Sequence, residues 1–461
     1  MNEITIEKIV DATNGKLLSG SKDNVIQEVC TDSRTAKKGD LFVPIIGEVH
    51  DAHKFIPQAY ERGCRAFLVS RTEAADGLKD CQIILVGDTT GAVQDLAAVY
   101  LEGLGLKKIA VTGSVGKTST RDMVHAILSE KFRTGTAKKN FNNSIGVPLT
   151  IFSFDDSLEA AVLEMGMDHA GEIHRLAEII RPDIGIITNV GISHIENFAD
   201  GRDGILKAKM EITDYFGPTN TLVINSDNDM LKKADFSGGY KLIRVGEEPE
   251  ADYRISDIRD YGEKGIRYTL SAEGKEYEIC LHVPGAHNAV NSALAIAGCR
   301  QMGVTTEQAI SGLAHLELTG KRLAVKEKNG ITVIDDTYNA APASMKSLID
   351  TLVHTDGQRK IAVFAGMNEL GAESPKYHRE VGEYAGKRDL DLLITVGEKA
   401  EDIAVGYRNV KDCGKAVHFD RKEDLYPEIK NLFRTGDVIA VKGSRLMEME
   451  QVAAEILKEQ E

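Results

Sequence analysis

The segment "IAVTGSVGKTSTRDMV", residues 109–124, has the composition of a phosphate-binding loop. Glycines allow consecutive backbone N–H groups to point inward, and the N-terminus of a following helix adds about half a positive charge. Lys117 would then reach the β- and γ-phosphates of a nucleotide, and the Thr118 hydroxyl would bind Mg²⁺. We therefore predict a nucleotide phosphate site made by Thr112, Gly113, Ser114, Val115, Gly116, Lys117, Thr118 and Ser119.

The glycine spacing of this segment differs from that of the common phosphate loop. In G-x-x-x-x-G-K-[ST] the second glycine follows the first by five positions, whereas Gly116 follows Gly113 by three. A tight turn whose glycines only permit close packing is the alternative interpretation. The Lys-Thr pair favours phosphate binding over that alternative.

Two further side chains could hold a metal ion beside the phosphates. Glu164 ends the strand-like run "EAAVLEMGM", and His194 follows the run "DIGIITNVG". Mg²⁺ prefers oxygen ligands, so Glu164 is the more natural ligand. Taken singly, a glutamate at a strand end is more often a hydrogen-bond acceptor for a loop, and a lone histidine is more often structural.

Lys209 interrupts an apolar helical stripe that also contains Ile205, Ile212 and Phe216. An ammonium group among apolar side chains is unusual. Snorkelling of the lysine head group to water is the simpler explanation, and spacing alone favours it.

The elements that would position these residues form an α/β protein of three domains. A chain of 461 residues exceeds what one core usually supports. We expect a small N-terminal α/β domain over 1–86, a central domain with a mostly parallel sheet over 87–313, and a C-terminal Rossmann-like, doubly wound domain over 314–461. The phosphate loop would follow a strand at residues 108–111, and ligands would bind at the carboxyl ends of such strands. Residues 253–283 suggest an antiparallel appendage.

Composition excludes several classes of protein. The apolar content of 42% and the charged content of 28% are those of an ordinary folded protein. A formal charge of −15 argues against a general nucleic-acid or membrane binder. With no basic-then-apolar leader and no run of about 18 apolar residues, we expect a cytoplasmic protein without membrane insertion. The six cysteines stand far apart and are expected to be reduced thiols.

Seven blocks, in order, resemble those of the Mur ligase family, whose members are ATP-dependent amide-forming enzymes of peptidoglycan precursor synthesis. The short loop "TGSVGKT" is followed by "LEMGM", "TNVGISHIENF", "KAKMEI", "GAHNAVNSALA", "GKRL" and "IDDTYNA". Within the family, "NFNNSIGVPLT", "DDTYNAAPASM", "AGMNELG" and "VKGSRLMEME" are most similar to the branch that joins D-alanyl-D-alanine to UDP-N-acetylmuramoyl-tripeptide. The third residue of that tripeptide, diaminopimelate or lysine, is left open.

The resemblance implies roles for individual residues. Lys117 and Thr118 would hold phosphate and Mg²⁺, with two Mg²⁺ ions bound by Thr118, Glu164, His194 and a carbamylated Lys209. Asn288 would contact the adenine of ATP, and Arg322 and Asp336 would contact its γ-phosphate and its ribose. Implied substrate contacts are Thr31, Asp32, Ser33, Arg34, Asn142, Asn143, Tyr338 and Asn339.

The resemblance further implies an acyl-phosphate mechanism, closure of the third domain over the second, and a monomer. Two departures from the family pattern stand out. Ala341 replaces an asparagine after "DTYNA", which puts one contact in doubt, and Ala52 stands where a glycine is common, which puts the local backbone conformation in question.

Overall fold

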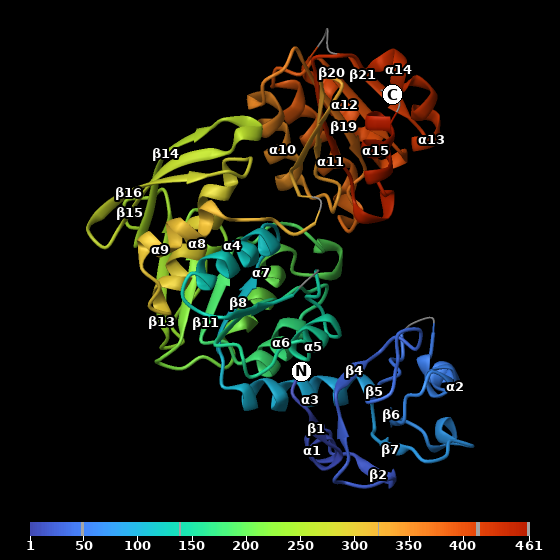
Figure 1. Ribbon diagram of the computed structural model, residues 1–461. Coiled ribbons are helices and arrows are strands. Elements are labelled where there is room, and N and C mark those ends of the chain that lie inside the picture. Colours follow the sequence, from blue (N-terminus) through green and yellow to red (C-terminus); the bar gives the residue numbers. More distant parts are fainter. Residues whose placement is uncertain (48–49, 138–139, 321, 412–414, 459–461) are drawn as a thin grey trace.

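The computed structural model describes residues 1–47, 50–137, 140–320, 322–411 and 415–458. Three sheets follow one another along the chain, and each belongs to a separate layered unit (Figure 1). Their strands span residues 16–85, 107–281 and 324–442. The α/β class is confirmed, and the expected boundaries at 86/87 and 313/314 fall between the sheets but stay predictions.

The N-terminal sheet has the order β2-β7-β6-β5-β4, with β2–β7 antiparallel and the other pairs parallel. A separate short ribbon pairs β1 with β3. The strands are β1 Ile4–Thr5, β2 Lys16–Ser19, β3 Val25–Ile26, β4 Glu28–Cys30, β5 Asp40–Phe42, β6 Ala66–Val69 and β7 Gln82–Leu85, and the helices are α1 Ile6–Ala12 and α2 Ile56–Glu61.

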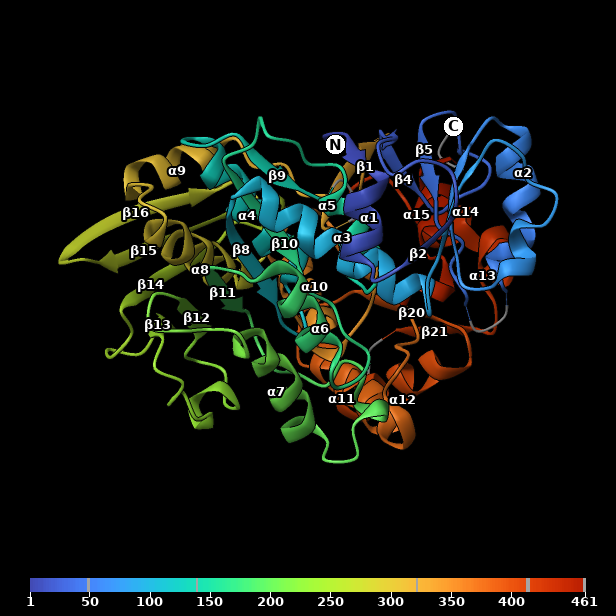
Figure 2. The same ribbon diagram turned by 90° about the horizontal axis from the view of Figure 1, so that it is seen from below.

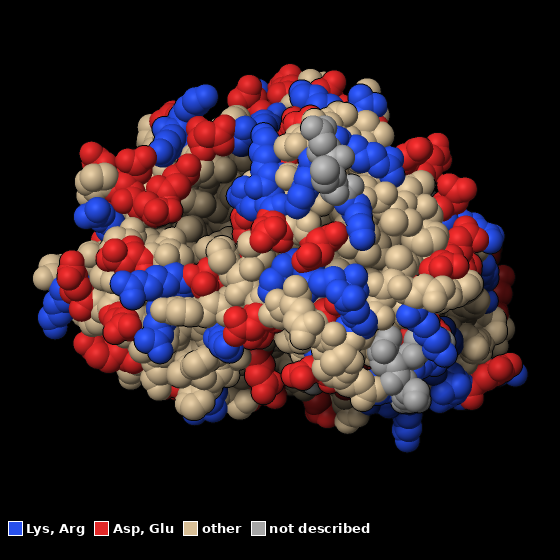
Figure 3. Space-filling view, turned by 90° about the horizontal axis from the view of Figure 1, so that it is seen from above, with Lys and Arg blue, Asp and Glu red and all other residues tan. Residues whose placement is uncertain are grey.

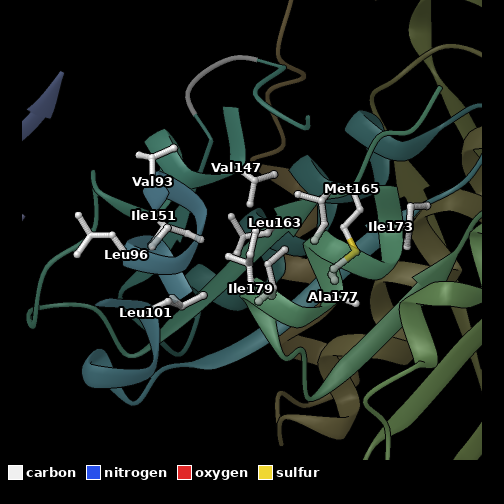
Figure 4. Packing of buried hydrophobic residues seen from close by; sticks show 14 of the residues in the cluster. Val93, Leu96, Leu101, Val147, Ile151, Leu163, Met165, Ile173, Ala177 and Ile179 are labelled. Atoms are coloured by element: carbon white, nitrogen blue, oxygen red, sulfur yellow. The ribbon is translucent and has the colours of Figure 1, made fainter. Parts of the chain in front are cut away.

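Helix α3, Thr89–Leu104, connects this unit to the central one (Figure 1, Figure 2). Asp88 caps its N-terminus by accepting hydrogen bonds from the N–H groups of Thr90 and Gly91, and Gly105 ends it in the left-handed conformation at φ 63°. Its apolar stripe packs with α5 and α6 around Leu163 (Figure 4). The helix therefore contributes to the central core.

The central sheet has the order β16-β15-β14-β13-β12-β11-β8-β10-β9 and is parallel from β9 through β14. The remaining pairs, β14–β15 and β15–β16, are antiparallel, which confirms the expected appendage. The strands are β8 Lys107–Thr112, β9 Thr134–Thr136, β10 Ala160–Glu164, β11 Ile184–Ile187, β12 Thr221–Asn225, β13 Lys241–Gly246, β14 Tyr253–Asp260, β15 Ile266–Ala272 and β16 Lys275–Leu281.

Helices cover both faces of the central sheet, because alternate residues of its buried strands point to opposite sides. One apolar cluster joins α3, α5, α6 and α7 to one face, and another joins α4, α8 and α9 to the other. These helices are α4 Lys117–Ser129, α5 Gly146–Ile151, α6 Glu172–Ile180, α7 Arg202–Met210, α8 His287–Gln301 and α9 Thr306–Ala314.

The third sheet has the order β17-β18-β22-β19-β20-β21 and is parallel except for the edge pair β17–β18. Helices α10, α11 and α12 pack on one face, and α13, α14 and α15 pack on the other. The strands are β17 Ala324–Lys328, β18 Ile331–Asp335, β19 Arg359–Ala365, β20 Leu392–Val396, β21 Ala416–Phe419 and β22 Asp437–Lys442. The helices are α10 Pro342–His354, α11 Ser374–Gly386, α12 Glu401–Val410, α13 Lys422–Leu425, α14 Ile429–Leu432 and α15 Glu450–Lys458.

The surface charges, the helix composition and the cysteines complete the description of the fold. Figure 3 shows one face of the molecule, on which Lys and Arg are interspersed with Asp and Glu. In the part of the chain that the structure describes, no helix combines the length and the apolar composition needed to cross a bilayer. Cys30, Cys64, Cys81, Cys280 and Cys299 are free thiols, and Cys413 lies outside the described residues.

Candidate active site

A cavity of about 670 Å³ lies between the central and the third units. Its floor is the carboxyl-terminal edge of β8, β10 and β11, the edge at which parallel sheets bind ligands. The phosphate loop, Glu164 and His194 line it from the central unit, and Arg322, Asp336, Tyr338, Asn339 and Lys442 line it from the other side.

The short phosphate loop is held by the loop that follows β11. Gly113 and Gly116 have φ values of 150° and 86°, and a Cβ on Gly113 would overlap the Thr188 hydroxyl. The N–H groups of Ser114 and Val115 donate to the backbone oxygen and the side-chain oxygen of Asn189, both at 3.0 Å. Because α4 begins at Lys117, the N–H groups of its first turn remain available to an anion.

Thr118 and Glu164 both line the cavity and contact each other. The Thr118 hydroxyl donates to Glu164 Oε2 at 2.7 Å, and the Asn142 amide donates to Glu164 Oε1 at 2.8 Å. Arg121, which is fully buried, places Nη1 3.6 Å from the same carboxylate. Asn143 also lines the cavity, where its side-chain oxygen accepts a hydrogen bond from the Gly146 N–H.

Two lysines lie near the loop, Lys209 buried and Lys117 only partly exposed, and desolvation lowers the pKa of each. Lys117 Nζ donates to the Gly113 carbonyl at 2.8 Å, and its lowered pKa results mainly from desolvation, which attraction to Glu164 opposes. Lys209 is 3% exposed, and desolvation together with the charge of Lys117 brings its pKa well below the usual value. With so little exposure Lys209 cannot snorkel to water, so that alternative is wrong.

His194 lines the cavity wall, with two carboxylates beside one of its ring nitrogens. Nδ1 is 3.1 Å from Asp168 Oδ1 and 2.7 Å from Glu369 Oε2. Within the described ranges, no three His, Cys, Asp or Glu side chains come close enough together to hold a metal ion by themselves. The Thr118 hydroxyl and the Glu164 carboxylate nevertheless fit Mg²⁺, which usually keeps waters and binds one or two carboxylates together with substrate phosphates.

The third unit brings cations and an acid to the same cavity. Arg322 donates to the Thr319 carbonyl at 3.0 Å, and its guanidinium carbon lies 4.1 Å from the centre of the Tyr338 ring. Asp336 forms a buried ion pair with Lys442. Asn339 lines the cavity beside Tyr338, and burial raises the pKa of the Tyr338 hydroxyl.

Other expected contacts lie outside the lining of this cavity. Asn288 is buried in α8, where its amide donates to the Pro284 carbonyl at 2.7 Å and accepts from Asn291 at 3.0 Å. In the N-terminal unit, Asp32 forms a bidentate pair with Arg34, and this hydrogen bonding lowers the pKa of Asp32 to about 2. Thr31 precedes that pair in the chain, and Ser33 donates to Gln58 at 2.6 Å.

Several residues that sequence reasoning missed also line the cavity or brace it. Asn189 braces the phosphate loop, His287 and Asn291 line the cavity from α8, and Lys442 pairs with Asp336. Asn189 and Asn291 lie inside blocks already singled out, so their polar side chains among apolar neighbours were an available signal. Lys442 likewise lies inside a block already singled out, "VKGSRLMEME", where it ends a strand run.

The two departures from the family pattern fit their surroundings. Ala52 lies in a 3₁₀ turn with an ordinary backbone, and Asp51 caps that turn by accepting from the His53 N–H at 2.9 Å, so no glycine is required there. Ala341 precedes α10, and its N–H and carbonyl both bond the Ser344 hydroxyl.

Comparison with known proteins matches this geometry. Residues 111–299 match the Mur ligase middle domain, and residues 321–445 match the Mur ligase, glutamate ligase domain. The UDP-N-acetylmuramoyl-tripeptide--D-alanyl-D-alanine ligase of Bacillus subtilis strain 168 is 35% identical over 98% of both chains. A crystal structure of MurF from Acinetobacter baumannii superposes with a TM-score of 0.92 at 30% identity, covering 99% of both chains. MurF ligase from Thermotoga maritima in complex with ADP superposes with a TM-score of 0.83 at 28% identity over 94% of this chain and 98% of that one. This chain belongs to the Mur ligase family.

Proposed function

We propose that this chain is an ATP-dependent ligase that joins D-alanyl-D-alanine to UDP-N-acetylmuramoyl-tripeptide. The products are UDP-N-acetylmuramoyl-pentapeptide, ADP and phosphate. The observation that carries the proposal is the contact between Thr118 and Glu164, at 2.7 Å, inside a cavity shared by the phosphate loop and the third domain. Relatives that match 98% of this chain over 98% of their own length are named for this reaction.

The reaction begins with activation of a carboxylate, because a free carboxylate is a poor acylating agent. An oxygen of the tripeptide carboxylate attacks the γ-phosphorus of ATP, and the bond from that phosphorus to the ADP oxygen breaks. The amine of D-alanyl-D-alanine then attacks the acyl carbon and loses a proton. The tetrahedral intermediate expels phosphate and leaves an amide.

Positioning and charge are the contributions of this chain's own residues. Lys117 must leave the Gly113 carbonyl to reach a phosphate, and the positive Arg322 faces it from the third domain. Closure of the third domain over the second would exclude water from the acyl phosphate. Asp336 and Asn288 are proposed ATP contacts, although the Asn288 amide would first have to exchange its present partners.

Magnesium is the metal that this set of residues suits. We propose two ions held by Thr118, Glu164, His194 and Lys209, and the bound metal would offset charge on the transferred phosphoryl group. The support is the oxygen-rich pair Thr118 and Glu164, together with the position of His194 on the cavity wall.

Carbamylation of Lys209 is part of the proposal. Burial and the nearby Lys117 favour the neutral amine, which is the form that attacks CO₂. The nitrogen lone pair forms a bond to the carbon of CO₂, one N–H proton leaves to solvent, and a carbamate anion results. Carbamylation gives this buried side chain two oxygen atoms that could bind a metal ion.

The muramoyl substrate is proposed to contact Thr31, Asp32, Ser33 and Arg34 at its UDP end, and Asn142, Asn143, Tyr338 and Asn339 nearer the reacting carboxylate. The family resemblance also implies a cytoplasmic, monomeric protein.

Phosphate release tests the ligase assignment. It should require UDP-N-acetylmuramoyl-tripeptide and increase when D-alanyl-D-alanine is added, whereas diaminopimelate or glutamate in its place should not support product formation. A protein that uses the phosphate loop only as a nucleotide-dependent switch, the alternative to a ligase, would show no dependence on the amine. Amine-independent release would refute the ligase assignment.

Matched variants test the site. Lys117→Ala should abolish ADP formation, and Glu164→Ala should weaken it in a way that extra Mg²⁺ restores only in part. Glu159→Ala is the control, because Glu159 precedes the same strand β10 at its opposite, exposed end. Equal activity of the Glu164 and Glu159 variants would contradict the metal assignment.

Lys207, on the same helix α7 as Lys209, provides a control for the test of the carbamate. Lys209→Ala should lose activity that a small added carboxylate partly restores, and wild-type activity should fall when CO₂ is removed. Lys207→Ala should behave as wild type, since Lys207 is exposed and pairs with Asp200. Wild-type activity insensitive to CO₂ would exclude the carbamate.

A further inference from the structure

The turn at residues 368–371, within the block "AGMNELG", meets the loop that carries His194. Glu369 Oε2 lies 2.7 Å from His194 Nδ1, and the Gly371 N–H donates to Glu196 Oε2 at 3.2 Å. The first contact joins a carboxylate to a ring nitrogen, and the second is a hydrogen bond from a backbone N–H. Together they hold the third domain to the two positions on either side of Ile195.

Apolar packing adds a third point of attachment. Ile192, two residues before His194, packs against the buried cluster that α10, α11 and α12 form with the third sheet. The loop after β11 is therefore held from the third domain over residues 192–196, whereas the strand that precedes it belongs to the central sheet.

Backbone geometry shows that this contact is constrained on both sides. His194 and Glu369 have φ values of 62° and 63°, in the left-handed region that residues other than glycine seldom occupy. Such residues are strained and persist only where their surroundings enforce the conformation. Two such residues in direct contact indicate that packing fixes how their side chains meet.

The chemistry of the contact concerns one ring nitrogen. Asp168 from the central domain and Glu369 from the third domain both approach Nδ1, at 3.1 and 2.7 Å. Neither approach has hydrogen-bond geometry in this structure, and a small rotation of the ring or of a carboxylate would complete the bond. A carboxylate at Nδ1 favours the tautomer that carries its proton there, which leaves the lone pair on Nε2 to bind a cation. Carboxylates in this position orient metal-binding histidines and raise their basicity.

We propose that Glu369 is a positioning residue that holds the His194 ring for metal binding, so that the metal site is complete only when the third domain is docked on the central one. The inference rests on the proposed function, which assigns His194 to the metal. In this proposal the block "AGMNELG" supplies Glu369, and this one side chain links domain closure to phosphoryl transfer.

Metal affinity of the full chain tests the proposal without measuring turnover. Mn²⁺, which accepts similar ligands, would be titrated in the presence of saturating ADP, with free Mn²⁺ read by electron paramagnetic resonance. Glu369→Gln should weaken Mn²⁺ binding roughly 10- to 100-fold, the usual effect of removing such a carboxylate. Glu373→Gln is the matched control, because Glu373 lies four residues on and pairs with Lys376 instead.

A second variant separates this inference from the proposed function. His194→Ala should weaken Mn²⁺ binding at least as much as Glu369→Gln, and the double variant should be no weaker than His194→Ala. If His194→Ala binds Mn²⁺ as wild type does, the metal assignment itself fails. If His194→Ala is weak while Glu369→Gln binds as the Glu373 control does, or more tightly, only the role of Glu369 is overturned.

Discussion

Replacing Asp122 with alanine should detach the linker to the third domain from the helix that follows the phosphate loop. Asp122 Oδ2 accepts from the Thr319 N–H at 2.7 Å, and Oδ1 accepts from the Thr319 hydroxyl at 3.1 Å. On its other side, Arg121 donates to Oδ1 through Nε at 3.0 Å and Nη2 at 2.5 Å. Asp122 thus joins a fully buried cation to the linker.

The expected cost is large because Arg121 has 0% exposure. Removing one partner of a buried ion pair typically destabilises by about 3–5 kcal/mol when the remaining charge is left unpaired. Arg121 keeps Glu164 at 3.6 Å, so we expect the lower end of that range, about 3 kcal/mol. For a domain of about 150–250 residues each kcal/mol lowers the Tm by about 2–4 °C, so we expect a fall of roughly 6–12 °C. Thr319→Val removes one side-chain hydrogen bond and should cost only about 1 kcal/mol.

Differential scanning calorimetry of the full chain measures these shifts. Asp156→Ala, on the surface before β10, is the control and should melt as wild type does. The KM for ATP should also rise in the Asp122 variant, because Arg322 donates to the carbonyl of the same Thr319. A Tm within about 2 °C of wild type would refute the reasoning about the buried pair.

Three further outcomes are expected. Burial lowers the pKa of His287 from 6.5 to about 4, so the unfolded chain binds more protons than the folded chain between these pH values. The free energy of unfolding should therefore fall by about 3 kcal/mol from pH 6.5 to pH 4. His287→Asn should flatten the dependence of Tm on pH. Gly382→Ala would push a Cβ into the Ile403 carbonyl and should destabilise the fold by about 1–3 kcal/mol. Gly103→Ala, in open space on α3, should stabilise the fold by up to about 1 kcal/mol. Shifts of the Tm measure both effects. Thr118→Val should raise the Mg²⁺ concentration needed for half-maximal ADP formation and Thr118→Ser should not, because only serine keeps the hydroxyl that reaches Glu164.

Local pattern determined the fold class and much of the candidate site. The strand before the phosphate loop, the helix after it and the antiparallel appendage all follow from periodicity, which depends on residues close in the chain. Glu164 was predictable because parallel strands end at one edge of their sheet, and Glu164 ends β10 beside the loop.

Only the tertiary structure decided what surrounds these residues. It buries Lys209 where spacing favoured snorkelling, and it turns the Asn288 amide toward the Pro284 carbonyl, just before its own helix. It also brings Glu369 to His194 and Asp122 to Thr319, contacts between segments more than 170 residues apart in the chain. Periodicity reports which face of an element is buried, whereas the partner of a buried charge is set by how separate domains pack, and no local pattern contains that information.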